Sequence, residues 1–275
     1  MLKQRLITAL ILAPIVLVCL FALDPIPFAW FIGAVIVLAA WEWANLADYQ
    51  TQLQRITYAA CIGLLVFVSS YLAVLWVLLA AMLWWLTATV LVLSYPASAT
   101  LWRSRQVKSV IGVLVLVPLW KALVFIRSAS LESFPDLSPL WVILYMLLLV
   151  WAADVGAYFS GKAWGKRKLA PQVSPGKSWA GAWGGLGTSV FLSLIATALL
   201  DGSTVFMLQL IMMSFLAGLI SIIGDLTESM FKRSRGIKDS SQLLPGHGGV
   251  MDRIDSLVAA VPVFVFLLLA VGWVV

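Results

Sequence analysis

The sequence predicts an all-α integral membrane protein, a polytopic bundle of about nine transmembrane helices. Of its 275 residues, 63% are hydrophobic and only 11% are charged, whereas about 25% of the residues in an ordinary soluble domain are charged. The mean hydropathy is +1.03. A globule of this size could not bury so much apolar surface away from water, so most of the chain must lie in lipid. These values exclude a soluble globular protein.

The first predicted span opens the chain. Lys3 and Arg5 precede a long apolar run, as in a secretory signal, but no small-x-small cleavage site closes that run before Asp24. We therefore expect residues 6–23 to remain in the protein as a membrane helix.

The later spans follow from the length of a crossing, about 20 helical residues for a hydrocarbon core about 30 Å thick. Residues 56–94 carry no charge over 39 positions. They correspond to about 58 Å of helix, which suits two crossings joined near Ser69 and Ser70. Charges, prolines and polar clusters divide the rest of the chain. After 6–23, the predicted spans are 28–47, 56–70, 72–94, 107–126, 137–159, 178–200, 204–224 and 256–275.

The basic residues predict the orientation, because Lys and Arg collect on the cytoplasmic side of a membrane. With a cytoplasmic N-terminus, 16 of the 18 Lys and Arg fall in cytoplasmic segments. Arg127 falls outside, and Lys121 lies near the outer end of its span, where a long side chain can reach the interface. Topology therefore explains the net charge of +6 better than nucleic-acid binding, which needs a continuous basic stripe. An odd number of spans puts the C-terminus outside, with outer loops that carry Asp24, Glu132, Asp136 and Asp201.

Polar residues are concentrated in two segments. Five of the 12 acidic residues and the only histidine, His247, fall between 225 and 255. Residues 154–181 contain Asp154, five Lys or Arg, and the run Ser174-Pro175-Gly176-Lys177-Ser178. Both segments lie on the cytoplasmic face in the predicted topology and could meet there.

The chain accordingly divides into two regions. The N-terminal transmembrane region, 1–130, has about five helices. The C-terminal transmembrane region, 131–275, carries the cytoplasmic-face loops 160–177 and 225–255 and is expected to hold the chemistry.

The segment after the eighth span is expected to continue as a helix. Asp225, Glu228 and Lys232 then fall at i, i+3 and i+7, on one face. A surface helix end with a Glu228–Lys232 pair would show the same pattern. The run Pro245-Gly246-His247-Gly248-Gly249 favours a ligand site, because its three glycines let the backbone adopt positive φ and approach a ligand closely.

Two carboxylates, Asp225 and Asp252, stand at opposite ends of an interfacial loop. Hard oxygen ligands beside Lys and Arg are what a Mg²⁺-nucleotide site requires. Topology and anionic lipid head groups also select for cytoplasmic basic residues, so the carboxylates are the sharper clue. We expect these two carboxylates to hold Mg²⁺.

The run from Ser174 to Ser178 invites comparison with a P-loop, but the earlier glycine of that pattern would stand at 171, which is Pro171, and no strand is expected before it. A weaker expectation remains. Gly176 and the amides after it, with Lys177 at the start of the seventh helix, could bind phosphate at the helix N-terminus. A proline-marked helix start with a snorkelling lysine explains the spacing equally well.

Two further acidic residues fall near or within predicted spans, where an ionisable group is costly and suggests function. Asp154 follows a long apolar run, although it could already lie at the interface. Glu42, between Trp41 and Trp43, faces either a polar cavity or a partner within the bundle.

The C-terminal residues resemble the signature of the phosphatidate cytidylyltransferases, or CDP-diacylglycerol synthases, which is similar to S-x-x-K-R-x4-K-D-x5-P-G-H-G-G-x-x-D-R-x-D. Thirteen fixed residues over 27 positions fit it without a gap. The upstream segment is similar to the family's S-P-x-K-[ST] and D-x-x-A-Y elements. The matching residues are Ser229, Lys232, Arg233, Lys238, Asp239, Pro245, Gly246, His247, Gly248, Gly249, Asp252, Arg253 and Asp255, with Asp154, Ala157, Tyr158, Ser174, Pro175, Lys177 and Ser178 upstream.

The resemblance implies the family's reaction in phospholipid biosynthesis, in which CTP and phosphatidic acid give CDP-diacylglycerol and pyrophosphate at the cytoplasmic membrane surface. It implies one or two Mg²⁺ ions, with Asp225 and Asp252 as ligands. It also implies an attack by the lipid phosphate itself, so that no protein nucleophile is needed. The expected catalytic residues are Asp225, Lys232, Lys238, Asp239, His247, Asp252, Arg253 and Asp255. The expected substrate-binding residues are Ser174, Lys177, Ser178, Ser229, Arg233, Gly248 and Gly249.

Several alternatives stay open at this point. His247 could donate to a phosphate, support a metal-bound carboxylate, act as a general base or only shape its turn. A transporter or channel would show polar residues deep in several spans and repeat symmetry, neither of which is evident. An enzyme of the same chemistry on another lipid phosphate or nucleotide is a closer rival, and a catalytically dead homologue would lack signature residues. The expected partners are CTP, phosphatidic acid and membrane lipids, and no nucleic acid is expected. The expected location is a bacterial inner membrane. Glycines 181, 184, 185 and 187 suggest close helix contacts within the bundle or across a homodimer.

Overall fold

The computed structural model describes residues 2–132 and 137–274, and helices dominate this part of the chain. Asp136 and Val275, which the predicted outer loop and ninth span include, lie outside the described residues, as do the side chains of Lys3 and Arg5. The elements in chain order are α1 (Leu2–Ala22), α2 (Pro25–Leu46), α3 (Gln52–Ser69), α4 (Val74–Leu93), the 3₁₀ helix η1 (Ala97–Thr100), α5 (Arg105–Ser128), α6 (Pro139–Trp164), β1 (Lys168–Ala170), β2 (Ser174–Ser178), α7 (Trp179–Leu199), α8 (Thr204–Arg235), α9 (Met251–Ile254) and α10 (Leu257–Ala270).

The helices confirm a polytopic, all-α membrane protein. Within the described residues, eight helices are long and apolar enough to cross a bilayer, namely α2 to α8 and the α9–α10 pair at Met251–Ala270. Each matches one predicted span, and α1, with its apolar stretch Leu10–Ala22, matches the first. The 39-residue run is divided as expected, because α3 ends at Ser69 and α4 begins at Val74.

Polar side chains define where several helices begin. At each of these N-termini a hydroxyl accepts a hydrogen bond from a backbone amide of the first turn, which satisfies a donor that has no partner within the helix. The capping residues are Thr51 for α3, Ser104 for α5, Ser138 for α6, Ser178 for α7 and Ser203 for α8.

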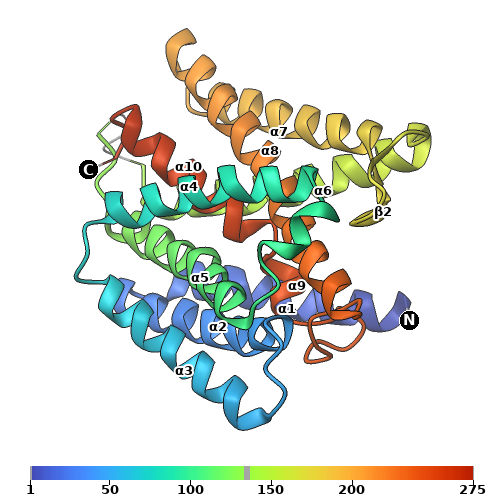
Figure 1. The fold of residues 1–275 in the computed structure, drawn as a ribbon. Coiled ribbons are helices and arrows are strands. Elements are labelled where there is room, and N and C mark those ends of the chain that lie inside the picture. The colour runs from blue at the N-terminus through green and yellow to red at the C-terminus, as the bar shows by residue number, and fades with distance from the viewer. Residues whose placement is uncertain (1, 133–136, 275) are drawn as a thin grey trace.

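The helices lie side by side, so that the bundle has two ends (Figure 1). α1 begins at the same end as the β1–β2 hairpin and the segment between α8 and α9, whereas α10 ends at the opposite end. An odd number of crossings requires this arrangement. We call the end with the hairpin the site end.

One hydrophobic core joins the two predicted regions. α5 contacts α2, α3, α4 and α10. Near the site end, the Phe231 ring of α8 packs on Trp102 and Trp43, at centroid distances of 4.7 Å and 5.1 Å. Residues from the N-terminal region therefore pack against the C-terminal part of α8, which carries Asp225, Glu228 and Lys232.

Small residues let α6 and α7 pack closely. This close packing explains three of the four glycines in α7. A Cβ at Gly184 would lie 1.9 Å from Ser160 Oγ, and one at Gly185 would lie 2.8 Å from the carbonyl oxygen of Ala153. Gly181 is similarly close to the carbonyl oxygen of Ala157. These three glycines serve packing within the bundle. Within the described part of the chain, nothing lies within 4 Å of the Cβ position of Gly187, and the homodimer stays a prediction.

Candidate active site

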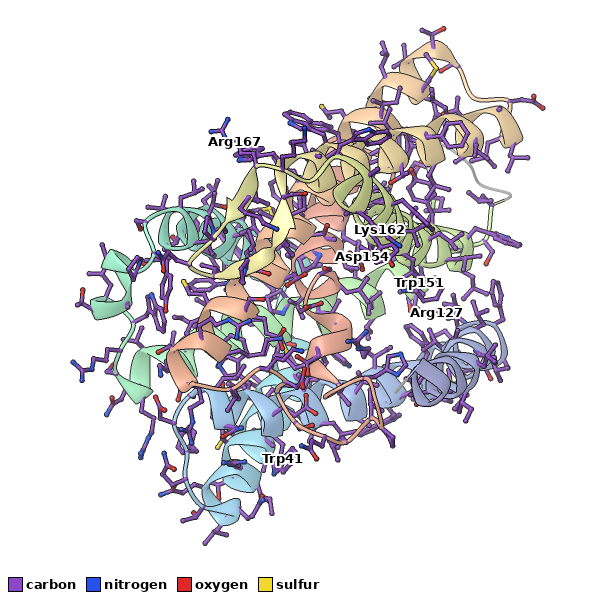
Figure 2. All side chains as sticks on the ribbon, turned by 90° about the vertical axis from the view of Figure 1, so that its right-hand side faces the viewer. Trp41, Arg127, Trp151, Asp154, Lys162 and Arg167 are labelled. Carbon is purple, nitrogen blue, oxygen red and sulfur yellow. The ribbon has the colours of Figure 1, made fainter. Side chains whose placement is uncertain are left out.

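A polar cavity of about 410 Å³ opens at the site end between α6, α7 and α8. Its lining includes Asp154 and Lys162 from α6, Lys177 from β2 and Asp225 from α8. Figure 2 looks onto this end and shows Asp154 and Lys162 on α6, with Arg167 at the outer edge of the hairpin. The two polar segments of the sequence therefore do meet in space.

An ion pair joins these segments inside the cavity. Lys177 Nζ lies 2.6 Å from Asp225 Oδ2, and the two side chains are 26% and 29% exposed, so a ligand in the cavity can reach both. Ser229 Oγ donates to Asp225 Oδ1 at 3.2 Å, one helical turn further along α8. Asp154 lies within electrostatic reach of Asp225, Lys177 and Arg253. The cavity thus combines carboxylates with a partly exposed ammonium group.

The strand that carries Lys177 corrects the expected local structure. α7 begins at Trp179, not at Lys177, and residues 174–178 pair with β1 in an antiparallel hairpin. Lys177 therefore lies before the helix, and at the α7 N-terminus Ser178 Oγ accepts the Gly181 amide as the cap. Phosphate binding by this segment stays a prediction. The segment 160–177, expected as a loop, is helical to Trp164 and contains the hairpin.

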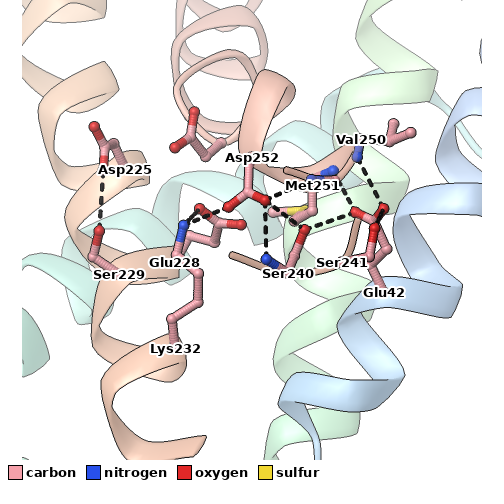
Figure 3. Close-up of polar contacts among 12 residues, drawn as sticks. Glu42, Asp225, Glu228, Ser229, Lys232, Ser240, Ser241, Val250, Met251 and Asp252 are labelled. Carbon is pink, nitrogen blue, oxygen red and sulfur yellow. Dashed lines mark hydrogen bonds and ion pairs between the residues drawn. The ribbon is translucent and has the colours of Figure 1, made fainter. Parts of the chain in front are cut away.

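A second charged cluster lies further along α8, toward its C-terminus at the site end. As predicted, α8 continues beyond the span to Arg235, so that Asp225, Glu228 and Lys232 share one face. Lys232 Nζ lies 2.6 Å from Glu228 Oε2 and 2.6 Å from Asp252 Oδ1 (Figure 3). Glu228 is 1% exposed and Asp252 is 6% exposed. Because these charges are shielded from water, Lys232 is needed to balance them.

The segment between α8 and α9 folds around Asp252. Asp252 Oδ2 accepts hydrogen bonds from the Ser240 amide at 2.9 Å, the Ser240 hydroxyl at 2.9 Å and the Gly249 amide at 2.7 Å. Both carboxylate oxygens therefore have partners, Lys232 on one side and the loop on the other. This arrangement orients the carboxylate and orders the loop at the same time.

Glu42 organises the same loop from α2, in the N-terminal half of the chain (Figure 3). Its carboxylate is fully buried and accepts four hydrogen bonds, from the Ser240 and Ser241 hydroxyls and from the Val250 and Met251 amides at the start of α9. The sequence predicts that Glu42 is functional because it is an acidic residue inside a predicted span, but it does not identify the partner of this carboxylate. The structure places that partner in the signature segment rather than in a polar cavity.

Two glycines of the signature are required by geometry. Gly248 has φ +83°, a conformation that other residues rarely adopt. A Cβ at Gly249 would lie 2.1 Å from Ser240 Oγ and 2.4 Å from Glu42 Oε2. Both glycines were expected to bind substrate, and the structure gives them a role in packing the loop against the carboxylates.

Replacing Gly249 with alanine is therefore expected to lower the free energy of unfolding by about 2 kcal/mol, because the added methyl group cannot fit without displacing the loop. Denaturation in detergent micelles measures this change. Gly187→Ala is the matched control, since nothing lies near that Cβ position, and equal stabilities for the two variants would contradict the packing role.

The remaining predicted site residues surround these clusters. Arg233 Nε donates to the carbonyl oxygen of Val173 at 3.2 Å and thereby ties α8 to the hairpin. Asp255 lies within electrostatic reach of Asp225, Glu228 and Lys232, and its Oδ1 accepts the Ser256 amide. The His247 amide donates to the Leu244 carbonyl oxygen within the turn. Ser174 is half-buried in β2, and three further residues are exposed at the site end, namely Lys238, Asp239 and Arg253.

The charge balance of the site fits a bound cation. Asp225, Glu228, Asp252 and Asp255 interact with one another, and their paired cations are Lys177 and Lys232. Glu228 Oε1 is buried and has no hydrogen-bond partner among the residues that the structure describes. Over residues 2–132 and 137–274, however, no three His, Cys, Asp or Glu side chains lie close enough together to form a complete metal site. A metal ion here would need ligands from a substrate as well as from the protein.

Comparisons with known proteins show the family of this chain. Residues 3–271 match the model of the cytidylyltransferase family. The chain is 52% identical to a phosphatidate cytidylyltransferase of Pseudomonas aeruginosa, with 99% of each chain covered. It is 43% identical to the phosphatidate cytidylyltransferase of Haemophilus influenzae, covering 96% of this chain and 97% of the relative, and 31% identical to that of Bacillus subtilis, covering 97% of each.

Proposed function

Because this chain belongs to the cytidylyltransferase family and is a nucleotidyltransferase, we propose that it joins CTP to phosphatidic acid, with CDP-diacylglycerol and pyrophosphate as products. Full-length relatives with this activity in their names support the choice of substrates. The observation that carries the proposal is the meeting of both polar segments at one cavity, where Lys177 pairs with Asp225. Two anionic substrates need such cations to approach each other.

The reaction is a direct displacement. A non-bridging oxygen of the lipid phosphate forms a bond to the α-phosphorus of CTP, and the bond from that phosphorus to the bridging oxygen of pyrophosphate breaks. The lipid oxygen is already ionised, so no protein group has to remove a proton or form a covalent intermediate. Positioning and charge neutralisation then account for most of the rate.

The cationic side chains divide between the two substrates. Lys177, which is exposed in the cavity, is positioned to bind a phosphate group when its pairing with Asp225 is exchanged. Arg253 and Lys238 are exposed at the same end and can reach a triphosphate. Lys232 is buried between Glu228 and Asp252, so its main role is to hold the carboxylates in place.

Mg²⁺ is part of this proposal, with Asp225 and Asp252 as protein ligands and one or two ions bound. Because both oxygens of Asp252 already have partners, Asp252 would exchange its contact with Lys232 for the ion. The ion would neutralise phosphate oxygens and stabilise the leaving pyrophosphate. The unpartnered Glu228 Oε1 beside these carboxylates supports an additional positive charge at this place.

With CTP present to complete the ligands of the ion, Mg²⁺ is expected to raise the unfolding temperature of the wild-type protein by a few degrees, because a ligand that binds the folded state stabilises it. In Asp225→Asn the increase is expected to be absent. Thermal unfolding in micelles with and without Mg²⁺ measures both, and an equal increase in the two proteins would contradict the assignment of Asp225.

The site end is proposed to face the cytoplasm of a bacterial inner membrane. This orientation follows from the basic residues at that end and from the bacterial sources of the relatives. It brings the cavity to the surface where CTP is dissolved and where the phosphate of a membrane lipid lies.

Pyrophosphate release by the purified protein tests the proposed function. Micelles that contain phosphatidic acid, CTP and Mg²⁺ should yield pyrophosphate, and omission of either the lipid or CTP should stop its release. A folded protein that releases none would refute the proposal and return attention to a different lipid phosphate or to transport.

A further inference from the structure

A large apolar groove lies next to the polar cavity. It has a volume of about 810 Å³ and is formed by α4, the β1–β2 hairpin, α7, α8 and α10. Its lining is mostly hydrocarbon and aromatic. The polar side chains in it are Thr89, Tyr95 and Gln172, and the Thr89 hydroxyl donates to the Trp85 carbonyl oxygen within α4. Representative side chains are Trp85, Leu93, Trp183, Leu186, Leu219 and Phe266.

The groove and the polar cavity share part of their walls. Leu169 of the hairpin, Ala182 of α7 and Ile222 of α8 line both. Ala182 has the smallest of these side chains and stands where the two spaces meet. On one side of this boundary are Lys177 and Asp225, and on the other side the lining carries no charged side chain. The joint space therefore suits a molecule with an anionic head and an apolar tail.

The depth of the groove matches one leaflet of a membrane. Its lining on α8 runs from Phe215 to Leu226, which corresponds to about 16 Å along the helix axis. Half of a hydrocarbon core is about 15 Å thick. The lining on α4 runs from Met82, near the middle of that helix, to Leu93 at its end, and the lining on α7 comes from its first two turns. The groove therefore begins at the site end and stops near the middle of the bilayer.

We propose that this groove binds an acyl chain of the lipid whose phosphate occupies the polar cavity. The inference rests on the proposed function, because it takes the lipid phosphate as the substrate. The shared wall lets one molecule occupy both spaces, and the groove lies at the depth of the chains of a lipid from the leaflet on the site-end side. A longer acyl chain covers more of the groove lining and is therefore bound more tightly.

The test fills the groove without touching the polar cavity. Leu219 lines the groove and is 43% exposed, whereas Leu208, on the same helix, is 59% exposed and lies outside all the cavities described. Leu219→Trp is expected to raise the KM for dioleoyl phosphatidic acid in mixed micelles about tenfold. The KM for CTP and the turnover of dihexanoyl phosphatidic acid should stay within twofold of wild type. Leu208→Trp should change none of these values.

Other outcomes assign the groove differently. Equal kinetics for Leu219→Trp and Leu208→Trp would overturn the proposal and leave the groove to bulk lipid. A change in oligomeric state with Leu219→Trp, measured by light scattering, would assign the groove to a second copy of the chain and also overturn it. Leu219→Ala, which widens the groove, provides a second variant and should shift preference toward bulkier acyl chains. A wild-type protein inactive on both lipids would refute the proposed function itself, a result distinct from these.

Discussion

Asp252→Asn is expected to lower kcat/KM by about 10³-fold or more, the largest effect of any single substitution in this site. The carboxylate of Asp252 balances Lys232 through Oδ1 and accepts three loop hydrogen bonds through Oδ2. An asparagine amide has one acceptor oxygen, so either Lys232 or the loop donors would face an NH₂ group. The substitution also removes one of the two proposed Mg²⁺ ligands.

Initial rates of product formation over a range of CTP and lipid concentrations give kcat/KM and measure this effect. Asp201→Asn is the matched control, because Asp201 lies in the α7–α8 connection, at the opposite end of the bundle, and its φ of +47° is tolerated by asparagine. The control should keep full activity. An Asp252→Asn enzyme within tenfold of wild type would contradict the role given to this carboxylate.

Glu42→Gln is expected to reduce kcat by about 10²-fold and the free energy of unfolding by about 3 kcal/mol, although residue 42 lies outside the signature. Four donors converge on this buried carboxylate, and a glutamine would direct its own NH₂ group at some of them. The Ser240 hydroxyl lies 2.9 Å from both Glu42 Oε2 and Asp252 Oδ2 and shares its single proton between them, so a displaced Ser240 also displaces the Asp252 carboxylate.

The division between kcat and KM distinguishes positioning from a general loss of folded protein. With the amount of folded enzyme fixed by active-site titration, kcat should fall while the KM for CTP changes little. Ser241→Ala removes one of the four donors and should have a much smaller effect. Glu132→Gln, an exposed position at the other end of the bundle, should have none. A Glu42→Gln enzyme with wild-type kcat would show that the loop does not depend on α2.

Much of the fold could be predicted because the bilayer dictates a crossing length. The division of 56–94 at Ser69 needed only that length, and the shared face of Asp225, Glu228 and Lys232 needed only the helical period. The β1–β2 hairpin could not be predicted in this way. A short Ser-Pro-Gly segment has weak strand preference, and its strand exists because residues 168–170 pair with it.

The hydrogen-bond and ion-pair partners within the site depend on tertiary structure and could not be predicted from the sequence. Lys232 has the expected partner at Glu228, but its second partner, Asp252, comes from a segment 20 residues further on. Gly248 and Gly249 were identified as special because glycine permits unusual backbone geometry. Whether that geometry served a ligand or the packing of Glu42 and Asp252 required coordinates. Glu42 shows the same limit, since an acidic residue in a span signals a partner but does not identify it.

The fate of a labelled phosphate tests the central claim most directly. The purified protein is given phosphatidic acid, Mg²⁺ and CTP that carries radioactive phosphorus at the α position in one reaction and at the γ position in another. The account predicts that the α label enters the lipid fraction as CDP-diacylglycerol, while the γ label remains in water as pyrophosphate. Transfer of the γ label to lipid, or an α label that stays in water while CTP is consumed, would contradict attack by the lipid phosphate on the α-phosphorus.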